Sequence, residues 1–183
     1  MMNFCETSIP GCYEITPKVF SDHRGGLIKT FHRDLYKANG LQPVFAEEYY
    51  SISKKGVLRG LHFQLPPQDH IKLVYCISGS VFDVILDLRV GSPTYGKTAS
   101  FELSAENRKI LYVTKGMAHG FYALSDAATL MYKSDTVYSP EHDAGILWTS
   151  ANIDWPNTNP IVSDKDKQQI SFAEFDSPFV FNA

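Results

Sequence analysis

A series of short apolar segments separated by turn residues runs through the middle of the chain, and it limits the possible folds more than any other feature. Gly, Pro, Ser and Asp residues bound these segments. We therefore predict strands at residues 44–53, 71–77, 80–88, 97–103, 110–113, 121–124 and 128–134. Short strands at roughly even spacing predict an all-β sandwich or jelly-roll barrel. Without a strand–helix–strand rhythm, a parallel nucleotide-binding sheet is not expected.

The sections before and after this series carry the remaining structure predictions. Residues 15–20 and 27–31 flank a turn-like Ser-Asp-His-Arg-Gly-Gly sequence and predict a hairpin. A short polar helix is predicted at residues 33–39, outside the core, and a second short helix at residues 164–175. No linker separates these sections, so we expect a single domain over residues 1–183.

The composition excludes several classes of protein. Apolar residues make up 44% of the chain, and the formal net charge of −3 provides no strong field to attract nucleic acid or a membrane. No apolar stretch reaches membrane-spanning length, and the N-terminal residues lack the pattern of a signal peptide. Cys5, Cys12 and Cys76 do not form the pattern of a disulfide framework, which favours a reducing compartment. We therefore expect a cytoplasmic protein with no nucleic-acid or membrane partner.

Ionisable residues interrupt the apolar pattern in the stretch from residue 55 to residue 67. Arg59 and His62 lie among core-type residues there, and Lys72 follows just beyond. Charged groups in such a strand must reach solvent or find a partner, and a strand that lines a polar cavity meets this need. Together with His119, these residues would form a hollow suited to an anionic ligand.

A metal site is the main competing interpretation of these residues. Barrels of the cupin type often bind metal through a His-x-His sequence, whereas here the residues are His62, Phe63 and Gln64. Lys72 adds a fixed cation where a metal needs neutral or anionic donors. We therefore expect no metal. Because a lone histidine on an apolar strand is more often structural, spacing alone leaves the role of His62 open.

Two further residues have an ordinary interpretation when only their spacing is considered. Tyr132 lies in an apolar segment at residues 130–133, which is typical of a core or interface tyrosine. Asp166 lies in a Ser-Asp-Lys-Asp sequence, which is typical of a solvated loop. Neither pattern by itself assigns a chemical role.

Short motifs in a fixed order connect this chain with a known enzyme family. They are Asp22-x-Arg24-Gly25, Gly56-Val-Leu-Arg-Gly-Leu-His62, Lys72-Leu-Val74, Val81-Phe-Asp-Val84, Gly91-Ser-Pro93, Leu103-Ser-Ala-Glu-Asn107, Ala118-His-Gly-Phe121, Tyr132-Lys133 and Pro140-Glu-His142. Through them the chain resembles the dTDP-4-dehydrorhamnose 3,5-epimerase family from about Val19 to Asp166. The resemblance implies an all-β, cupin-type double-stranded β-helix, or jelly roll, with short peripheral helices.

The resemblance also implies a reaction. The substrate would be a nucleotide-diphosphate-linked 4-keto-6-deoxy sugar, in which the C3 proton is acidic because C3 adjoins the C4 ketone. His62 matches the family's base, Asp166 matches the carboxylate that orients it, and Lys72 matches a cation near the ketone oxygen. Tyr132 matches the acid that returns a proton to the opposite face. The reaction that the resemblance implies needs no cofactor. Inversion at C3 alone and inversion at both C3 and C5 stay open.

Other matched positions imply how the substrate is held. They are Arg24, Arg59, His119, Tyr138, Asp143 and Lys165. The first three match residues that hold the diphosphate and the sugar, Tyr138 matches a ring that stacks on the base, and Asp143 stands where the family usually has Glu. Family members are typically homodimers that exchange N-terminal strands, so residues 24–29 would serve the partner's site.

The chain departs from the family pattern around the nucleotide base. Lys29 replaces a Glu, Glu47-Glu48-Tyr49 replaces Gln-Asp-Asn, and His70 replaces a Gln. Lys29 can donate to the N3 and O2 acceptors of cytosine, whereas Glu accepts from the N3–H of thymine, so we expect CDP rather than dTDP. The alternative is that Lys29 turns to solvent and the protein still binds dTDP. Glu47 and Tyr49 are expected to contact the same substrate, with Glu47 accepting from the cytosine amino group.

Two alternatives to epimerisation remain. A ketoisomerase on the same barrel would move the keto group, and a catalytically silent protein would bind the sugar nucleotide without reacting. The presence of His62, Lys72, Tyr132 and Asp166 favours an epimerase, because a pure binding protein needs no base and acid together.

Overall fold

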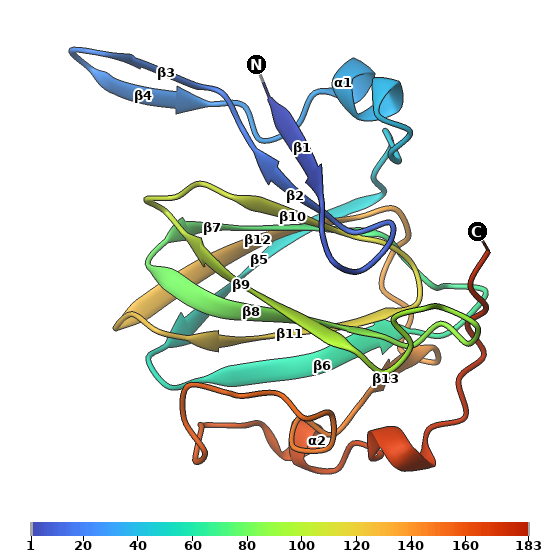
Figure 1. Cartoon of the computed structure of the whole chain (residues 1–183). Coiled ribbons are helices and arrows are strands. Elements are labelled where there is room, and N and C mark those ends of the chain that lie inside the picture. Colours follow the sequence, from blue (N-terminus) through green and yellow to red (C-terminus); the bar gives the residue numbers. More distant parts are fainter. Residues whose placement is uncertain (1, 183) are drawn as a thin grey trace.

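The protein folds as two antiparallel sheets packed face to face, with short helices at the periphery (Figure 1). The computed structural model describes residues 2–182. The order in the six-stranded sheet is β1 (Asn3–Glu6), β2 (Tyr13–Thr16), β10 (Ile110–Val113), β7 (Lys72–Ser78), β12 (Ala127–Ser134) and β5 (Glu47–Lys54). The five-stranded sheet has the order β13 (Asp143–Gly145), β6 (Leu58–Gln64), β11 (Met117–Ala123), β8 (Ser80–Asp87) and β9 (Thr98–Ser104). This arrangement confirms the predicted jelly roll.

The main core lies between the two sheets. Strands of both sheets alternate their side chains, and the inward set contributes Val74, Ile85, Leu111, Phe121 and Leu130, all of which are buried. Each fully buried side chain of this size stabilises the fold by roughly 1.5–3 kcal/mol. The predicted strands at the centre of the chain are therefore confirmed, and most of them contribute side chains to this core.

The outer face of the six-stranded sheet is covered by α1 (Arg33–Ala38). The helix is present as predicted, but its placement outside the core was wrong. Tyr36 is fully buried in a second cluster with Leu73 and Tyr75, and its ring meets that of Phe4 edge-on at 5.3 Å. One aromatic side chain thus anchors a helix whose other residues are mostly polar.

The C-terminal section covers the outer face of the five-stranded sheet, where Phe179 packs in a cluster with Phe63. The predicted helix at residues 164–175 is instead α2 (Asp164–Lys167) followed by the 3₁₀ helix η1 (Phe172–Glu174). Ile170 separates them because its carbonyl accepts from the Leu147 N–H at 2.8 Å, a pairing that a continuous helix would not allow. The strand β13 in this section was not predicted.

Near the N-terminus, β3 (Val19–Asp22) and β4 (Gly25–Ile28) form the predicted hairpin, which projects away from the two sheets (Figure 1). The segment expected at residues 15–20 is divided between β2 and β3 because Pro17 interrupts the run and has no N–H to donate. Phe20 and Leu27 on this hairpin are exposed. We call β3 and β4 together the N-terminal ribbon.

In residues 2–182, neither helix has the length and apolar character that crossing a bilayer requires.

Candidate active site

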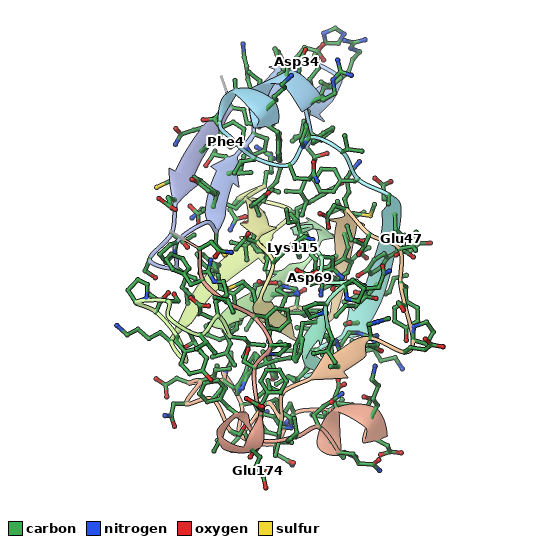
Figure 2. All side chains as sticks on the ribbon, turned by 90° about the vertical axis from the view of Figure 1, so that its right-hand side faces the viewer. Phe4, Asp34, Glu47, Asp69, Lys115 and Glu174 are labelled. Atoms are coloured by element: carbon green, nitrogen blue, oxygen red, sulfur yellow. The ribbon has the colours of Figure 1, made fainter. Side chains whose placement is uncertain are left out.

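A cavity of about 460 Å³ opens between the two sheets and gathers most of the predicted site residues. Those that line it are Glu47, Tyr49, Arg59, His62, Lys72, His119, Tyr132, Tyr138, Asp143 and Lys165. Glu47, which is labelled in Figure 2, is the first residue of β5. Three predicted residues do not line this cavity: Arg24 and Lys29 lie on or next to the N-terminal ribbon, and Asp166 lies on α2.

A bulge in β6 explains how Arg59 and His62 share one cavity although three positions separate them. In the ladder, His62 pairs with His119 and Arg59 with Phe121, so β6 has one residue more than β11 between these pairs. Gly60 lies in this bulge at φ +139°, and a Cβ atom there would come within 2.6 Å of the neighbouring backbone. The extra residue reverses the alternation of side chains, and glycine is what allows it.

His62 is oriented by Asp166, which lies behind it on α2. The His62 Nε2 atom is 2.6 Å from Asp166 Oδ1, and Asp166 Oδ2 accepts from the Gly60 N–H at 3.3 Å. Burial would raise the pKa of Asp166, but the hydrogen bond and charge of His62, with the Gly60 N–H, outweigh it and lower that pKa. A carboxylate that accepts from Nε2–H leaves Nδ1 of a neutral imidazole with its lone pair free. His62 therefore has the arrangement of a general base.

Lys72 is a buried cation beside this histidine. Its Nζ lies 3.4 Å from the His62 carbonyl oxygen, and it forms no ion pair with a carboxylate in residues 2–182. Burial lowers the pKa of Lys72 to about 8, and the charges of Asp143 and Asp83 oppose that shift. Such an ammonium group can stabilise negative charge that develops on a substrate oxygen.

Tyr132 enters the cavity from the other sheet. It is buried on β12, and its hydroxyl lies 3.3 Å from the Ser51 hydroxyl. Burial raises the pKa of Tyr132 well above its usual value, although the Ser51 hydrogen bond opposes the change. The phenol is therefore protonated at neutral pH and can act as an acid. Because His62 belongs to the five-stranded sheet and Tyr132 to the six-stranded sheet, the two side chains approach the cavity from facing walls.

His119 and Arg59 complete the inner wall. The His119 Nε2 atom lies 2.9 and 3.0 Å from the two carboxylate oxygens of Asp83, which is fully buried. Arg59 donates from Nε to the Ser53 hydroxyl at 3.0 Å and from Nη2 to the Ile52 carbonyl at 3.2 Å. These bonds leave the guanidinium group attached to β5 with further donors free for an anion.

The mouth of the cavity is formed by a small polar group. Asp143 Oδ2 accepts from the Tyr138 hydroxyl at 2.9 Å and from the Lys165 ammonium group. Glu47 Oε2 accepts from the Tyr138 backbone N–H at 2.9 Å. The structure therefore joins Glu47, Tyr138, Asp143 and Lys165 in one hydrogen-bonded group, whereas the sequence predicted each of them separately as a binding residue.

Several residues of the site were missed by the sequence analysis. They are Ser51, Gln64 and Asp83. Ser51 and Gln64 could have been found as the residues two positions from Tyr49 and His62 on the same strands, because alternate residues share a face. Asp83 is a lone carboxylate in an apolar segment, and such a buried charge indicates that a partner or a polar site lies nearby.

His70 lies on the loop before β7 and lines the cavity. Its Nε2 atom is buried without a hydrogen-bond partner in residues 2–182. Burial lowers the pKa of His70 to about 2, and the positive charge of Lys72 adds to the effect, so the ring is neutral. The preceding residue, Asp69, forms an ion pair of 3.6 Å with Lys115, which lies close to it in Figure 2.

In residues 2–182, no three His, Cys, Asp or Glu side chains are grouped so that they could hold a metal ion. The expectation that the reaction needs neither metal nor cofactor stays a prediction.

Comparison with known proteins agrees with this geometry. Residues 6–174 match the sequence model of the dTDP-4-dehydrorhamnose 3,5-epimerase family. A dTDP-4-dehydrorhamnose 3,5-epimerase of Shigella flexneri is 46% identical over 178 residues, which cover 96% of this chain and 98% of that protein. A dTDP-4-dehydrorhamnose 3-epimerase of Streptomyces niveus is 41% identical over 91% of this chain and 82% of that protein.

A solved structure extends the comparison to the fold. The dTDP-6-deoxy-D-glucose-3,5-epimerase of Legionella pneumophila, crystallised with dTDP-4-keto-L-rhamnose, has a TM-score of 0.95, 37% sequence identity and complete coverage of both chains. The jelly roll and the cavity between its two sheets are those of a cupin-type isomerase. The chain belongs to the dTDP-4-dehydrorhamnose 3,5-epimerase family and is an epimerase.

Proposed function

We propose that the protein inverts C3 of a dTDP-linked 4-keto-6-deoxy sugar by removing a proton from one face and returning one to the other. His62 Nδ1 takes the C3 proton, and the electron pair of the broken C–H bond moves to the C4 oxygen as an enolate. Lys72 stabilises that oxygen. Tyr132 then gives its hydroxyl proton to C3 from the opposite face, and the enolate electrons form the new C–H bond.

The observation that carries this proposal is the origin of base and acid in facing sheets. A sugar ring bound between β6 and β12 would present one face to His62 and the other to Tyr132. The test is incubation with dTDP-4-keto-6-deoxy-D-glucose in deuterated water, followed by NMR. We expect deuterium at C3 of an inverted product. Unlabelled, unchanged sugar would indicate a silent binding protein, and a displaced carbonyl would indicate a ketoisomerase.

We propose that C5 is inverted as well, since C5 also adjoins the C4 ketone and its proton is acidified by the same carbonyl. The names of two relatives differ on this point: the Shigella flexneri protein is named a 3,5-epimerase and the Streptomyces niveus protein a 3-epimerase. The same NMR experiment tests this point. Deuterium at both carbons supports double inversion, and deuterium at C3 alone contradicts it.

The nucleotide is proposed to be dTDP because the Shigella and Legionella relatives carry that nucleotide in their names. The expectation of CDP rested on Lys29 and Glu47. Lys29 does not line the cavity of its own chain, while Glu47 lines it and accepts from the Tyr138 N–H. Calorimetric titration with dTDP, CDP and UDP decides between them. Tighter binding of CDP than of dTDP would overturn the dTDP proposal and support the role of Lys29.

We propose a homodimer in which the N-terminal ribbon of each protomer reaches the partner's cavity. The support is the projection of this ribbon from the sheets, its exposed Phe20 and Leu27, and the position of Arg24 outside its own cavity. Complementation tests the exchange. In a mixture of His62→Ala and Arg24→Ala protomers, a mixed dimer would contain one site with both residues intact. Recovered activity supports the exchange, and activity no higher than that of either variant alone contradicts it.

A cytoplasmic location is proposed on the state of the cysteines. Cys5, Cys12 and Cys76 are all free thiols, and the last two are buried, which suits a reducing compartment. Fractionation of the source cells would test this, and recovery of the enzyme outside the cytoplasmic fraction would contradict it.

A further inference from the structure

Two residues of β5 hold Tyr132 in place. Tyr49 lies directly opposite Tyr132 in the β5–β12 ladder, and their rings stack with centroids 4.8 Å apart and planes at 14°. Ser51 is two residues further along β5, and its hydroxyl lies 3.3 Å from the Tyr132 hydroxyl. The ring of His119 meets Tyr132 edge-on, with centroids 6.3 Å apart. These contacts restrict both the plane of the phenol ring and the position of its oxygen.

We propose that Tyr49 and Ser51 are positioning residues that hold the Tyr132 phenol where it can return a proton to the face of the sugar opposite His62. This inference rests on the proposed epimerisation and adds two residues to it. Neither residue has a match in the catalytic group that the sequence resemblance implies. Tyr49 stands where the family pattern has Asn, so the ring stack is a feature of this chain.

The chemistry of the proton transfer gives Ser51 its role. When the Tyr132 O–H bond breaks, the proton goes to C3 and the electron pair stays on oxygen as a phenolate. Burial makes that charge costly, and the Ser51 hydroxyl can rotate to donate a hydrogen bond to it. A hydrogen bond to a charged group is worth roughly a tenfold or greater change in an equilibrium or rate.

The stack with Tyr49 acts on geometry. A cross-strand aromatic pair limits the directions in which the Tyr132 ring can turn. Proton transfer depends steeply on alignment, and a displacement of about 1 Å can cost up to about 100-fold in rate. Loss of the stack should therefore slow the return of the proton while His62 continues to remove protons.

The experiment measures how the enolate divides between two fates in deuterated water. Deuteration from the His62 side gives labelled sugar that is not inverted, and deuteration from Tyr132 gives inverted product. We expect the ratio of inverted product to labelled, uninverted sugar to fall roughly 10-fold in Ser51→Ala and in Tyr49→Leu. Ser51→Thr keeps the hydroxyl and Tyr49→Phe keeps the ring, so each is expected to restore the ratio. The ratio is insensitive to a change in substrate affinity.

Tyr50→Leu is the matched control, because Tyr50 is the next residue of the same strand, is 63% exposed and does not line the cavity. It is expected to leave the ratio as in the unmodified protein. An unchanged ratio in both Ser51→Ala and Tyr49→Leu would overturn the inference while leaving the epimerase proposal intact. If the unmodified protein incorporated no deuterium, the proposed function would fail, and this inference with it.

Discussion

Two histidine–carboxylate pairs lie next to each other in the five-stranded sheet, and they differ in their surroundings. His62 on β6 and His119 on β11 are direct partners across the ladder. The His62 side chain is 34% exposed, and its partner Asp166 comes from α2, outside the sheet. The His119 side chain is 5% exposed, and its partner Asp83 comes from the adjoining strand β8.

The comparison shows that a histidine beside a carboxylate is not, by that alone, placed to act as a general base. Burial raises the pKa of Asp83, with His119 and Lys72 opposing that shift. The pKa of Asp166 is lowered, because its hydrogen bonds with His62 and Gly60 outweigh burial. The outer pair, His62 and Asp166, thus has a stable carboxylate and an imidazole that is partly open to the cavity. The inner pair, His119 and Asp83, is buried. We interpret the first as catalytic and the second as part of the wall that holds the sugar nucleotide.

Removal of the outer imidazole should have the largest effect. His62→Ala is expected to lower deuterium exchange at C3 by up to about 10⁴-fold, because no other general base lies at that position. Calorimetry should show that dTDP binds with nearly unchanged affinity, which separates loss of the base from loss of the fold. Near-normal exchange in this variant would remove His62 from its proposed role.

Removal of the charge behind the base should be the next largest effect. Asp166→Asn keeps the shape of the side chain, but its amide can hold His62 in the wrong tautomer and cannot stabilise the imidazolium. We expect the exchange rate to fall roughly 10²-fold to 10³-fold, with dTDP affinity preserved. Asp164→Asn is the matched control on the same helix, since Asp164 is exposed and, within residues 2–182, pairs only with Lys167. Equal losses in the two variants would contradict the assignment.

Lys72 contacts His62 of the outer pair, and the charge of Asp83 in the inner pair acts on its ammonium group. Titration of Lys72 should therefore make the activity depend on pH. Its pKa is lowered to about 8, so the ammonium form predominates below pH 8 and is lost as the pH rises above it. The turnover rate is therefore expected to fall above pH 8, by up to about tenfold per pH unit. Lys72→Met should be slow at every pH and lack this decline. If the decline persisted in Lys72→Met, another group would be responsible.

The inner pair should matter more for stability than for chemistry. Asp83→Ala leaves the buried His119 Nε2 without a partner, and we expect the free energy of unfolding to fall by about 1–3 kcal/mol. Exchange at C3 should fall by less than about tenfold. Asp166→Ala should cost less stability, because water can reach the half-buried His62. Urea titrations of both variants test this order, and the reverse order would contradict the comparison.

The sequence contained enough information to predict the central strands and the jelly roll, but not to find the partners of the site residues. Apolar segments bounded by turn residues predicted the central strands. They did not predict β1 and β13, which have four and three residues, or the burial of Tyr36, which depends on a face of a distant sheet. Local patterns fail where an element is defined by what it packs against.

The site shows the same limit. His62 and Asp166 are 104 positions apart, and the pairing is made by a helix that docks behind β6. By spacing alone Asp166 has the pattern of a solvated loop, whereas it is buried. The shared cavity of Arg59 and His62 depends on the bulge at Gly60, which strict alternation could not predict. The motif resemblance assigned these roles where periodicity could not.

The central claim is that base and acid act from facing walls of one cavity, and Tyr132→Phe tests it most directly. In deuterated water with dTDP-4-keto-6-deoxy-D-glucose, the variant keeps His62 and Lys72 but has no phenolic proton to return. We predict that deuterium still enters C3 at a rate within about threefold of the unmodified enzyme, while inverted product falls by at least about 100-fold. Exchange and inversion that fall in parallel would contradict the assignment of Tyr132 as the acid on the opposite face.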